Sequence, residues 1–332
     1  MTDRETAGAP GDPIVETHGL TKRFGGRSGL EDLDLEVRRG VSLAVLGPAA
    51  SGKTTLIRLL SGLARPPAGT ITALGARVGA RQWLPARRRL GVVSSNPVFH
   101  AWMSGREVVD FAAHMAGLPA RERRTRVDEA LGLVGLRGVA AERVSTYSSG
   151  LRRRLGLAQA VAGRPDRVLL DEPLGALDPD DRSELLGALD AIRRAATIVF
   201  TTRSLADTEL LADRVALLDG GRLVLEATIA DLLDRLAQPI YAIEAERDQG
   251  AALSALNARL RQERWVAWTA LEAAGIRVAV ADPARAARDL LPVVLAAGVR
   301  VAAFGRRRPT LDDLLAELSG AHRTDGPEGR AA

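Results

Sequence analysis

The sequence predicts an α/β fold with a mainly parallel sheet covered by helices on both faces, followed by a smaller α+β domain. Two observations support the first part. Short apolar strands alternate with helical segments, and a glycine-rich turn joins a buried strand at residues 41–46 to a helix at residues 53–63. The second part is supported by the order of elements after residue 239, which is β-α-β-β-α-β, as in ferredoxin-like domains.

The elements of the first domain follow from apolar periodicity and from turn residues. Strands are expected at residues 14–24, 33–37, 41–46, 90–93, 168–170 and 197–202. Helices are expected at residues 53–63, 105–118, 120–136 and 151–162. We place this domain at residues 14–237, with a helical subdomain at about 96–160 and a disordered tail at residues 1–13.

The second domain follows a boundary near residues 237–239. Its expected strands are residues 240–245, 265–271, 276–280 and 299–303, and its expected helices are residues 251–260, 284–297 and 311–318. The last of these helices is additional to the ferredoxin-like order. We place this domain at residues 238–319 and a disordered tail at residues 320–332.

Composition excludes several classes of function. The 332 residues suffice for about two domains, 46% of them are hydrophobic, and the absence of cysteine excludes disulfides and thiol chemistry. No apolar run reaches membrane length, and the first 13 residues lack the apolar stretch of a signal peptide, so we expect a soluble chain. The net charge of +5 comes mostly from scattered arginines, which indicates a solvated basic surface and no nucleic acid partner.

A phosphate-binding loop follows the strand at residues 41–46. The pattern G-x-x-x-x-G-K-[ST] is matched by Gly47, Pro48, Ala49, Ala50, Ser51, Gly52, Lys53 and Thr54, with Thr55 next in the helix. Glycines let backbone N–H groups turn toward phosphate oxygens, and the helix N-terminus adds partial positive charge. Lys53 supplies a cation for the phosphates, and the Thr54 hydroxyl can ligate Mg²⁺. An ordinary glycine-rich turn would not need one of the chain's two lysines at this position.

Two acids end the buried strand at residues 168–170. Asp171 can hold Mg²⁺ through water, and Glu172 can polarise an attacking water. By itself, an apolar run followed by two acids is usually no more than the end of a strand. In combination with the phosphate loop, it indicates an Mg²⁺-dependent nucleotide site.

The ordered set of motifs resembles the ATP-binding subunit of an ABC transporter over residues 14–235. Residues 147–155 (YSSGLRRRL) are similar to the LSGGQ signature of that family, and residues 173–179 (PLGALDP) are similar to its D-loop, which here contains Asp178. Phe24 is at the position of the aromatic residue that stacks on adenine. From the residues alone, a packing role for Phe24 and a simple helix cap at the signature stay open.

This resemblance implies that two ATPase subunits act together. ATP, with Mg²⁺ at Thr54 and Asp171, would be enclosed between two subunits arranged head to tail. In this arrangement, the γ-phosphate bound by one subunit meets three signature residues of the other, which correspond here to Ser148, Ser149 and Gly150. The sequence leaves open whether the second subunit is a copy of this chain or a different ATPase.

Two positions depart from the family's pattern. The family has a glutamine after the strand at residues 90–93, contacting Mg²⁺ and the attacking water, and Ser95 is at that place here. It also has a histidine that reaches the γ-phosphate after the strand at residues 197–202, and here that residue is Arg203. An arginine can neutralise phosphate charge but cannot exchange protons near neutral pH. We therefore expect ATP hydrolysis with Glu172, Arg203 and Ser95 as the catalytic set, and slow turnover.

The C-terminal segment and the lack of a membrane span suggest a partner. Residues 309–320 (PTLDDLLAELSG) are similar to the ends of ATPase subunits of ABC-2-type exporters, many of which are assigned to drug or antibiotic efflux. Transport then requires a separate membrane permease, and the chain would lie at the cytoplasmic face of the cell membrane, bound through it. The docking surface is expected near Ser95, at Phe99, Trp102 and Met103, unless these residues belong to the helical subdomain's own core.

Other functions stay open at this point. The chain could be an ATP-dependent clamp or regulatory protein with little hydrolysis, or the degenerate partner in an ATPase heterodimer. A soluble ABC ATPase of translation or DNA repair is a further alternative. Those proteins usually carry two ATPase units per chain or a long coiled-coil insertion, and neither is visible in the sequence.

Overall fold

The structure of the protein is a computed structural model that describes residues 12–24, 27–236, 239–246, 248–272, 274–307 and 313–314. The chain divides into two units, Met1–Ile229 and Ala230–Ala332, and each is described by itself. The predicted tail at residues 320–332 and nearly all of that at residues 1–13 lie outside the described residues. No helix in the described part of the chain has the length and apolar character needed to cross a membrane.

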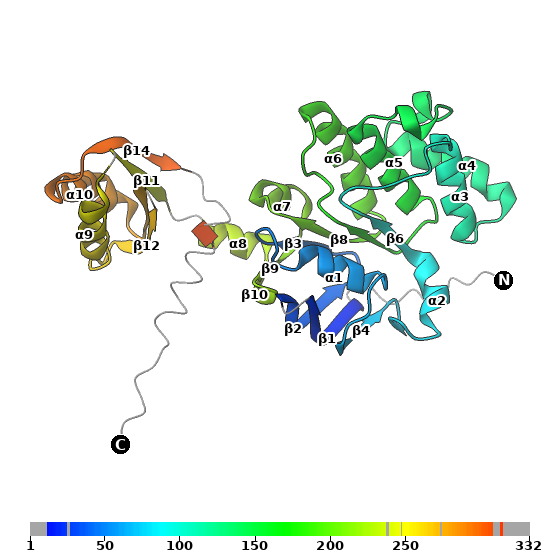
Figure 1. The fold of residues 1–332 in the computed structure, drawn as a ribbon, viewed down its shortest axis with the longest axis horizontal. Coiled ribbons are helices and arrows are strands. Elements are labelled where there is room, and N and C mark those ends of the chain that lie inside the picture. Colours follow the sequence, from blue (N-terminus) through cyan, green and yellow to red (C-terminus); the bar gives the residue numbers. More distant parts are fainter. Residues whose placement is uncertain are drawn as a thin grey trace, which may run out of the picture. The chain divides into compact units, whose positions relative to one another are not determined.

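A six-stranded sheet forms the centre of the first unit (Figure 1). Its order is β10-β9-β3-β8-β7-β6, and all neighbours are parallel except β10, which pairs antiparallel with β9. The strands are β3 (Ser42–Leu46), β6 (Leu90–Val93), β7 (Arg167–Leu170), β8 (Thr197–Thr202), β9 (Arg214–Asp219) and β10 (Arg222–Thr228). The predicted parallel α/β sheet is therefore confirmed, with β9 and β10 added to the strands expected from sequence.

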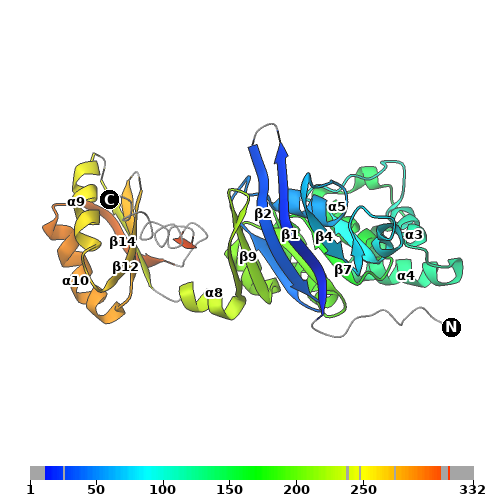
Figure 2. The ribbon, with the colours of Figure 1, turned by 90° about the horizontal axis from the view of Figure 1, so that it is seen from below.

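A second, antiparallel sheet in this unit was not predicted. Its order is β2-β1-β4-β5, and Figure 2 shows β2, β1 and β4 side by side. The strands are β1 (Pro13–Phe24), β2 (Arg27–Arg38), β4 (Ala68–Ala73) and β5 (Ala76–Arg77). The expectation of a strand at residues 33–37 only was wrong, because β2 pairs with β1 along nearly its whole length. Strands β1 and β2 are consecutive in the chain, but β1 also pairs with the distant β4, as Val15 with Ala73, and local periodicity does not report that pairing.

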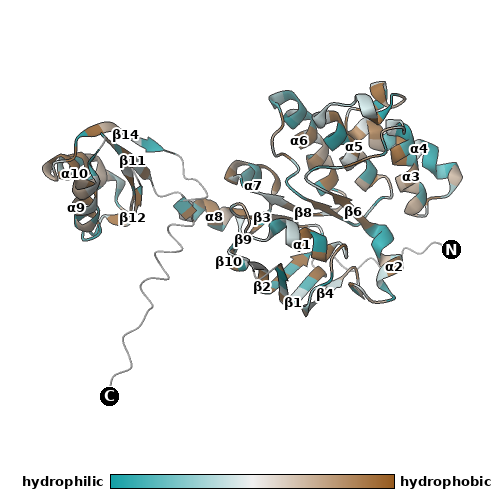
Figure 3. Cartoon of the chain, in the orientation of Figure 1, coloured by the Kyte–Doolittle hydropathy of each residue, from teal (hydrophilic) through white to brown (hydrophobic). Residues whose placement is uncertain are grey.

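One core joins the two sheets through helix α1 (Lys53–Leu60). Its apolar face (Leu56, Ile57, Leu59 and Leu60) packs with strand residues such as Leu33 of β2 and Val199 of β8. Every residue of β3, β7 and β8 is buried, as expected for strands of a parallel sheet with both faces covered, and Figure 3 shows hydrophobic colouring at β8. The helix ends at Leu60, three residues before the predicted position 63. Gly62, just beyond this end, adopts a left-handed φ of 73°, as is common after helices.

The remaining helices of this unit lie mostly on the other side of the six-stranded sheet (Figure 1). They are α2 (Trp83–Ala86), α3 (Gly105–Met115), α4 (Ala120–Leu133), α5 (Ser149–Val161), α6 (Pro179–Arg193) and α7 (Leu205–Leu211). Helix α3 begins with a capping box, in which Ser104 accepts from the Glu107 N–H while the Glu107 carboxylate accepts from the Ser104 N–H. Helix α4 ends at Leu133, before the predicted position 136, next to Gly135 with its positive φ of 69°.

The second unit has the predicted ferredoxin-like arrangement. Its antiparallel sheet has the order β12-β13-β11-β14, with helices between the first and second and between the third and fourth strands along the chain. The elements are β11 (Ile240–Ala245), α9 (Gly250–Leu260), β12 (Val266–Glu272), β13 (Gly275–Val280), α10 (Pro283–Ala296) and β14 (Val301–Arg307), and α8 (Ile229–Leu236) precedes them. Of the predicted helix at residues 311–318, only residues 313–314 are described, and they are helical. Asp313 is buried and forms ion pairs with Arg277 and Arg307.

Candidate nucleotide-binding site

A cavity of about 420 Å³ opens where β3, β7 and β8 end at their carboxyl sides. Parallel sheets usually bind ligands outside this end of their strands. Most of the predicted site residues meet here, because the lining residues are Phe24, Gly29, Ala49, Ala50, Ser51, Gly52, Lys53, Thr54, Thr55, Glu172 and Arg203. Gly29 was not predicted from the sequence. It lies so close to Phe24 that an added Cβ would be only 2.9 Å from the ring.

The phosphate loop holds the Lys53 ammonium inside its own curve. Gly52 has a φ of 101°, which glycine adopts easily, and this allows the chain to turn directly into α1. Lys53 Nζ donates to the carbonyls of Gly47 (2.8 Å) and Pro48 (2.7 Å), and the residue is buried. Burial lowers the pKa of Lys53, and the nearby Glu172 carboxylate partly opposes this. An anion in the loop would meet both this cation and the first N–H groups of α1.

Thr54 and Asp171 bring two kinds of oxygen ligand together. Thr54 Oγ1 lies 3.1 Å from Oδ1 and 3.0 Å from Oδ2 of Asp171. Asp171 is buried at the end of β7, where its N–H donates to the Val93 carbonyl at 2.9 Å. Hydroxyl and carboxylate oxygens beside a phosphate loop are the donor set that Mg²⁺ uses in nucleotide sites, where phosphates and water complete the coordination. The residues present therefore fit Mg²⁺.

Thr201, which the sequence analysis missed, connects the two acids. Its hydroxyl donates to Asp171 Oδ1 at 2.7 Å and accepts from the Glu172 N–H at 2.8 Å. In the sequence, Thr201 looks like an ordinary β-branched strand residue. The available signal was its position at the carboxyl end of β8, because β8 is parallel to β7, the strand that leads into Asp171 and Glu172.

Glu172 and Arg203 form an ion pair at the edge of the cavity. Arg203 Nη2 donates to Glu172 Oε2 at 3.2 Å, and the side chains of Arg203 and Glu172 are 58% and 26% exposed. Glu172 has a left-handed φ of 45°, an uncommon backbone conformation for a residue with a side chain. Ser95 does not line the main cavity, but it borders a cavity of about 10 Å³ together with Glu172 and Arg153. Arg153 Nη1 donates to the Glu172 carbonyl at 3.2 Å.

Phe24 lies at the rim of the main cavity. Half of its surface is exposed, so it is not a core residue. The Lys22 ammonium lies 5.5 Å from the centroid of its ring, in a cation–π arrangement. A flat ring at this place can stack on a planar base.

The signature residues and Asp178 do not line this cavity. Ser148 is the N-cap of α5 and accepts from the Leu151 N–H at 3.1 Å, so Ser149 and Gly150 form its first turn. Asp178 is the N-cap of α6, and the bond from the Asp181 N–H lowers the pKa of its carboxyl group. The Asp181 carboxylate packs so closely on Gly150 that an added Cβ would lie 1.6 Å from Oδ2. A larger residue at this point of the signature would therefore require the Asp181 carboxylate to move.

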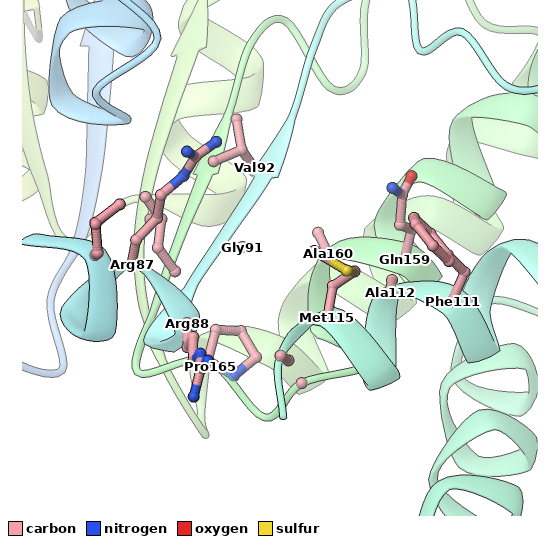
Figure 4. A pocket seen from close by; sticks show the side chains of 14 residues that line it. Arg87, Arg88, Gly91, Val92, Phe111, Ala112, Met115, Gln159, Ala160 and Pro165 are labelled. Atoms are coloured by element: carbon pink, nitrogen blue, oxygen red, sulfur yellow. The ribbon is translucent and has the colours of Figure 1, made fainter. Parts of the chain in front are cut away.

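A separate groove of about 510 Å³ lies along β6, the last strand of the six-stranded sheet (Figure 4). Gly91 and Val92 of β6 form one wall, and Phe111, Met115 and Gln159 from the helical part face them. Phe111 and Met115 are both more than half exposed. Among the residues predicted for docking, Trp102 is 68% exposed and stacks on His100, so it does not belong to a core.

Comparison with known proteins identifies the family of the chain. The sequence profile of the family described as "ABC transporter" matches residues 30–175. The chain is 32% identical to the daunorubicin resistance ATP-binding protein DrrA3 of Streptomyces coeruleorubidus, over 94% of this chain and 98% of that protein.

Two solved structures are also similar. One, described as the ATP binding subunit of an ABC transporter, has a TM-score of 0.61 and 26% identity, and covers 68% of this chain and 93% of that one. The other, a dimeric post-hydrolysis state of the ATP-binding cassette MJ0796 with ADP and Pi, has a TM-score of 0.60 and 23% identity, over 65% of this chain and 99% of that one. With a curated relative matched over nearly its full length, this chain belongs to the ABC transporter family, as one of its ATP-binding subunits.

Proposed function

We propose that this subunit binds Mg²⁺-ATP, hydrolyses it slowly, and drives an exporter whose membrane permease is a separate chain. The observation that carries the proposal is the placement of Lys53, Thr54 and Glu172 around one cavity, with the Asp171 carboxylate hydrogen-bonded to Thr54 beside it. Lys53 would bind the β- and γ-phosphates, and Glu172 would accept a proton from the attacking water. Bound Mg²⁺ would neutralise phosphate charge between Thr54 and Asp171. Phe24 would hold the adenine.

Slow turnover is proposed because Arg203 is hydrogen-bonded to the Glu172 carboxylate. One of the carboxylate oxygens accepts an N–H from Arg203, and this bond competes with the proton that Glu172 would have to accept. The Arg203 side chain is mostly exposed to solvent, which screens the pair and keeps its contribution to about 0–1 kcal/mol. A γ-phosphate could therefore attract Arg203 away and free Glu172. Ser95 lines the same small cavity as Glu172. Its side chain is too short to contact both Mg²⁺ and the attacking water, as a glutamine could.

A head-to-tail dimer is proposed because the signature lies outside the cavity of its own chain. Ser148, Ser149 and Gly150 present a helix N-terminus, which attracts anions, and the phosphate loop needs a second donor set to enclose a γ-phosphate. The similar cassette MJ0796 was solved as a dimer with ADP and Pi bound. The partner subunit here is either a second copy of this chain or a different ATPase.

The groove along β6 is the proposed docking site for a helix of the permease. It offers exposed apolar side chains, Phe111 and Met115, to the apolar face of an amphipathic helix. Binding there would place this chain at the cytoplasmic face of the membrane. The name of the relative DrrA3 supports a drug-like substrate and a role in antibiotic resistance.

The test combines light scattering with co-purification. Glu172→Gln should dimerise at saturating Mg²⁺-ATP, alone or with its permease or a companion ATPase, and should remain monomeric with ADP. A monomer in every combination would contradict the dimer. Phe111→Glu with Met115→Glu should abolish co-purification with the permease and leave ATP binding unchanged. Leu210→Glu, an equally exposed apolar position that does not line the groove, should have no effect on co-purification.

A further inference from the structure

A buried hydroxyl lies between the two acids that end β7. Thr201 is fully buried on β8, and its Oγ1 lies 2.7 Å from Asp171 Oδ1 and 2.8 Å from the Glu172 backbone nitrogen. Strands β7 and β8 pair in parallel up to Leu170 and Phe200, so Thr201 is the first residue beyond the last paired position. Its side chain continues the connection between the strands where the regular ladder ends.

The chemistry of the three groups fixes the orientation of this hydroxyl. A threonine hydroxyl has one proton to donate and two lone pairs that accept. An ionised Asp171 can only accept, and the Glu172 N–H can only donate. The proton of Thr201 must therefore point to Asp171, and a lone pair must face Glu172. One side chain thus positions two successive acids, one through its carboxylate and the other through its backbone.

The backbone of Glu172 needs such support. Its φ of 45° lies in the left-handed region, which residues with a side chain adopt only when the surrounding structure holds them. The N–H bond to Thr201 and the bond from Arg153 to the Glu172 carbonyl both act on this residue. Of the two residues that make these bonds, only Thr201 also bonds to Asp171.

We infer that Thr201 is a positioning residue of the ATPase site, which holds Asp171 for Mg²⁺ and fixes the direction in which Glu172 leaves β7. This inference rests on the proposed function, because the acids matter only where nucleotide is bound and hydrolysed. Thr201 does not touch the nucleotide cavity, since it is absent from its lining among the described residues. Its effect passes through Asp171 and Glu172 alone.

The test replaces Thr201 with valine, which has nearly the same shape and lacks the hydroxyl. Removing a partner of a metal ligand typically costs about 10- to 100-fold in metal affinity or activity. We expect kcat to fall by about that factor and the Mg²⁺ concentration for half-maximal nucleotide binding to rise, while KM for ATP changes little. Binding of ATP in EDTA, followed with a fluorescent analogue, should be unchanged. Thr201→Ser keeps the hydroxyl and should restore both the rate and the Mg²⁺ dependence.

Thr197→Val is the matched control. Thr197 is buried on the same strand, and its hydroxyl accepts from the Gly40 N–H at 2.9 Å, at the end of the strand away from the acids. It should lower thermal stability as much as Thr201→Val and leave kcat and Mg²⁺ dependence unchanged. If Thr201→Val does not fold, Thr201→Cys, whose thiol bonds weakly, should shift both quantities in the same direction.

The outcomes separate the inference from the proposed function. The role of Thr201 would be overturned if the wild type hydrolyses ATP and the Thr201→Val variant has the same kcat and the same Mg²⁺ dependence. A loss of the same size in the serine variant would also overturn it, because the hydroxyl would then not be the cause. A wild type that binds no ATP would instead contradict the proposed function itself.

Discussion

The two ends of the six-stranded sheet carry similar polar residues and use them differently. At the carboxyl ends of the strands, Asp171 and Glu172 bond to side chains that border a cavity. At the amino ends, Thr197 accepts from the Gly40 N–H at 2.9 Å, and Asp213 accepts from the Ser42 N–H at 2.8 Å. The bonds at the amino ends satisfy backbone groups of neighbouring segments, so they fasten the fold.

This difference indicates which substitutions should change chemistry and which should change stability. A bond between two side chains can open to admit a ligand at little cost, since water or the ligand replaces it. A bond that satisfies a buried backbone N–H cannot open without leaving that group unpaired. We expect variants at the carboxyl end to change binding and turnover, with or without a loss of stability, and variants at the amino end to change the free energy of unfolding and leave binding and turnover unchanged.

The largest effect is expected for Glu172→Gln. The amide cannot accept a proton from water, and removing one such group typically slows the chemical step by about 10²- to 10³-fold. ATP binding should be retained, because Lys53 and Thr54 are untouched. The measurement is steady-state phosphate release beside a nucleotide titration. Glu209→Gln, an exposed acid on α7, is the control and should keep the full rate. Equal rates for all three proteins would remove Glu172 from the mechanism.

Lys53→Ala should have the next largest effect. It removes the cation that the loop holds at 2.7–2.8 Å from its own carbonyls, and we expect nucleotide binding to weaken by about tenfold or more, which corresponds to about 1.4 kcal/mol or more. Isothermal titration of the folded variant measures this. Arg58→Ala removes a charge from the exposed side of the same helix and should leave the affinity unchanged. An unchanged affinity of Lys53→Ala would contradict the assignment of the phosphate loop.

The sequence alone predicted the features that depend on neighbouring residues. The phosphate loop, the buried strand before the acids and the ferredoxin-like order all follow from short patterns. The antiparallel sheet could not be predicted in the same way, because Val15 of β1 pairs with Ala73 of β4, far along the chain. The contacts of Thr201 and the pairing of Arg203 with Glu172 also depend on which strands become neighbours, which a single sequence does not reveal.

The two departures from the family's pattern offer a gain-of-function prediction. Ser95→Gln combined with Arg203→His should free Glu172 from its ion pair and restore two contacts to water and γ-phosphate. We expect turnover to rise several-fold, up to about tenfold, with ATP affinity little changed. Phosphate release should be measured for wild type, the double variant and Arg203→Ala. If wild type already hydrolyses ATP at a rate typical of the family, and the double variant gains nothing, Ser95 and Arg203 are adequate substitutes and the slow-turnover proposal is wrong.

The smallest effect is expected at the amino end of β7, for Arg167→Met. Arg167 is fully buried; its Nη2 donates to the Leu60 carbonyl at 3.3 Å, while Nε and Nη1 have no hydrogen-bond partner within the described residues. Burial lowers the pKa of this guanidinium, as expected for a charge that folding disfavours. Methionine fills similar space without the charge, so the free energy of unfolding should fall by less than about 1 kcal/mol, or rise. ATP affinity and turnover should match wild type. A loss above about 3 kcal/mol in urea denaturation would show that the charge is paired and stabilises the fold.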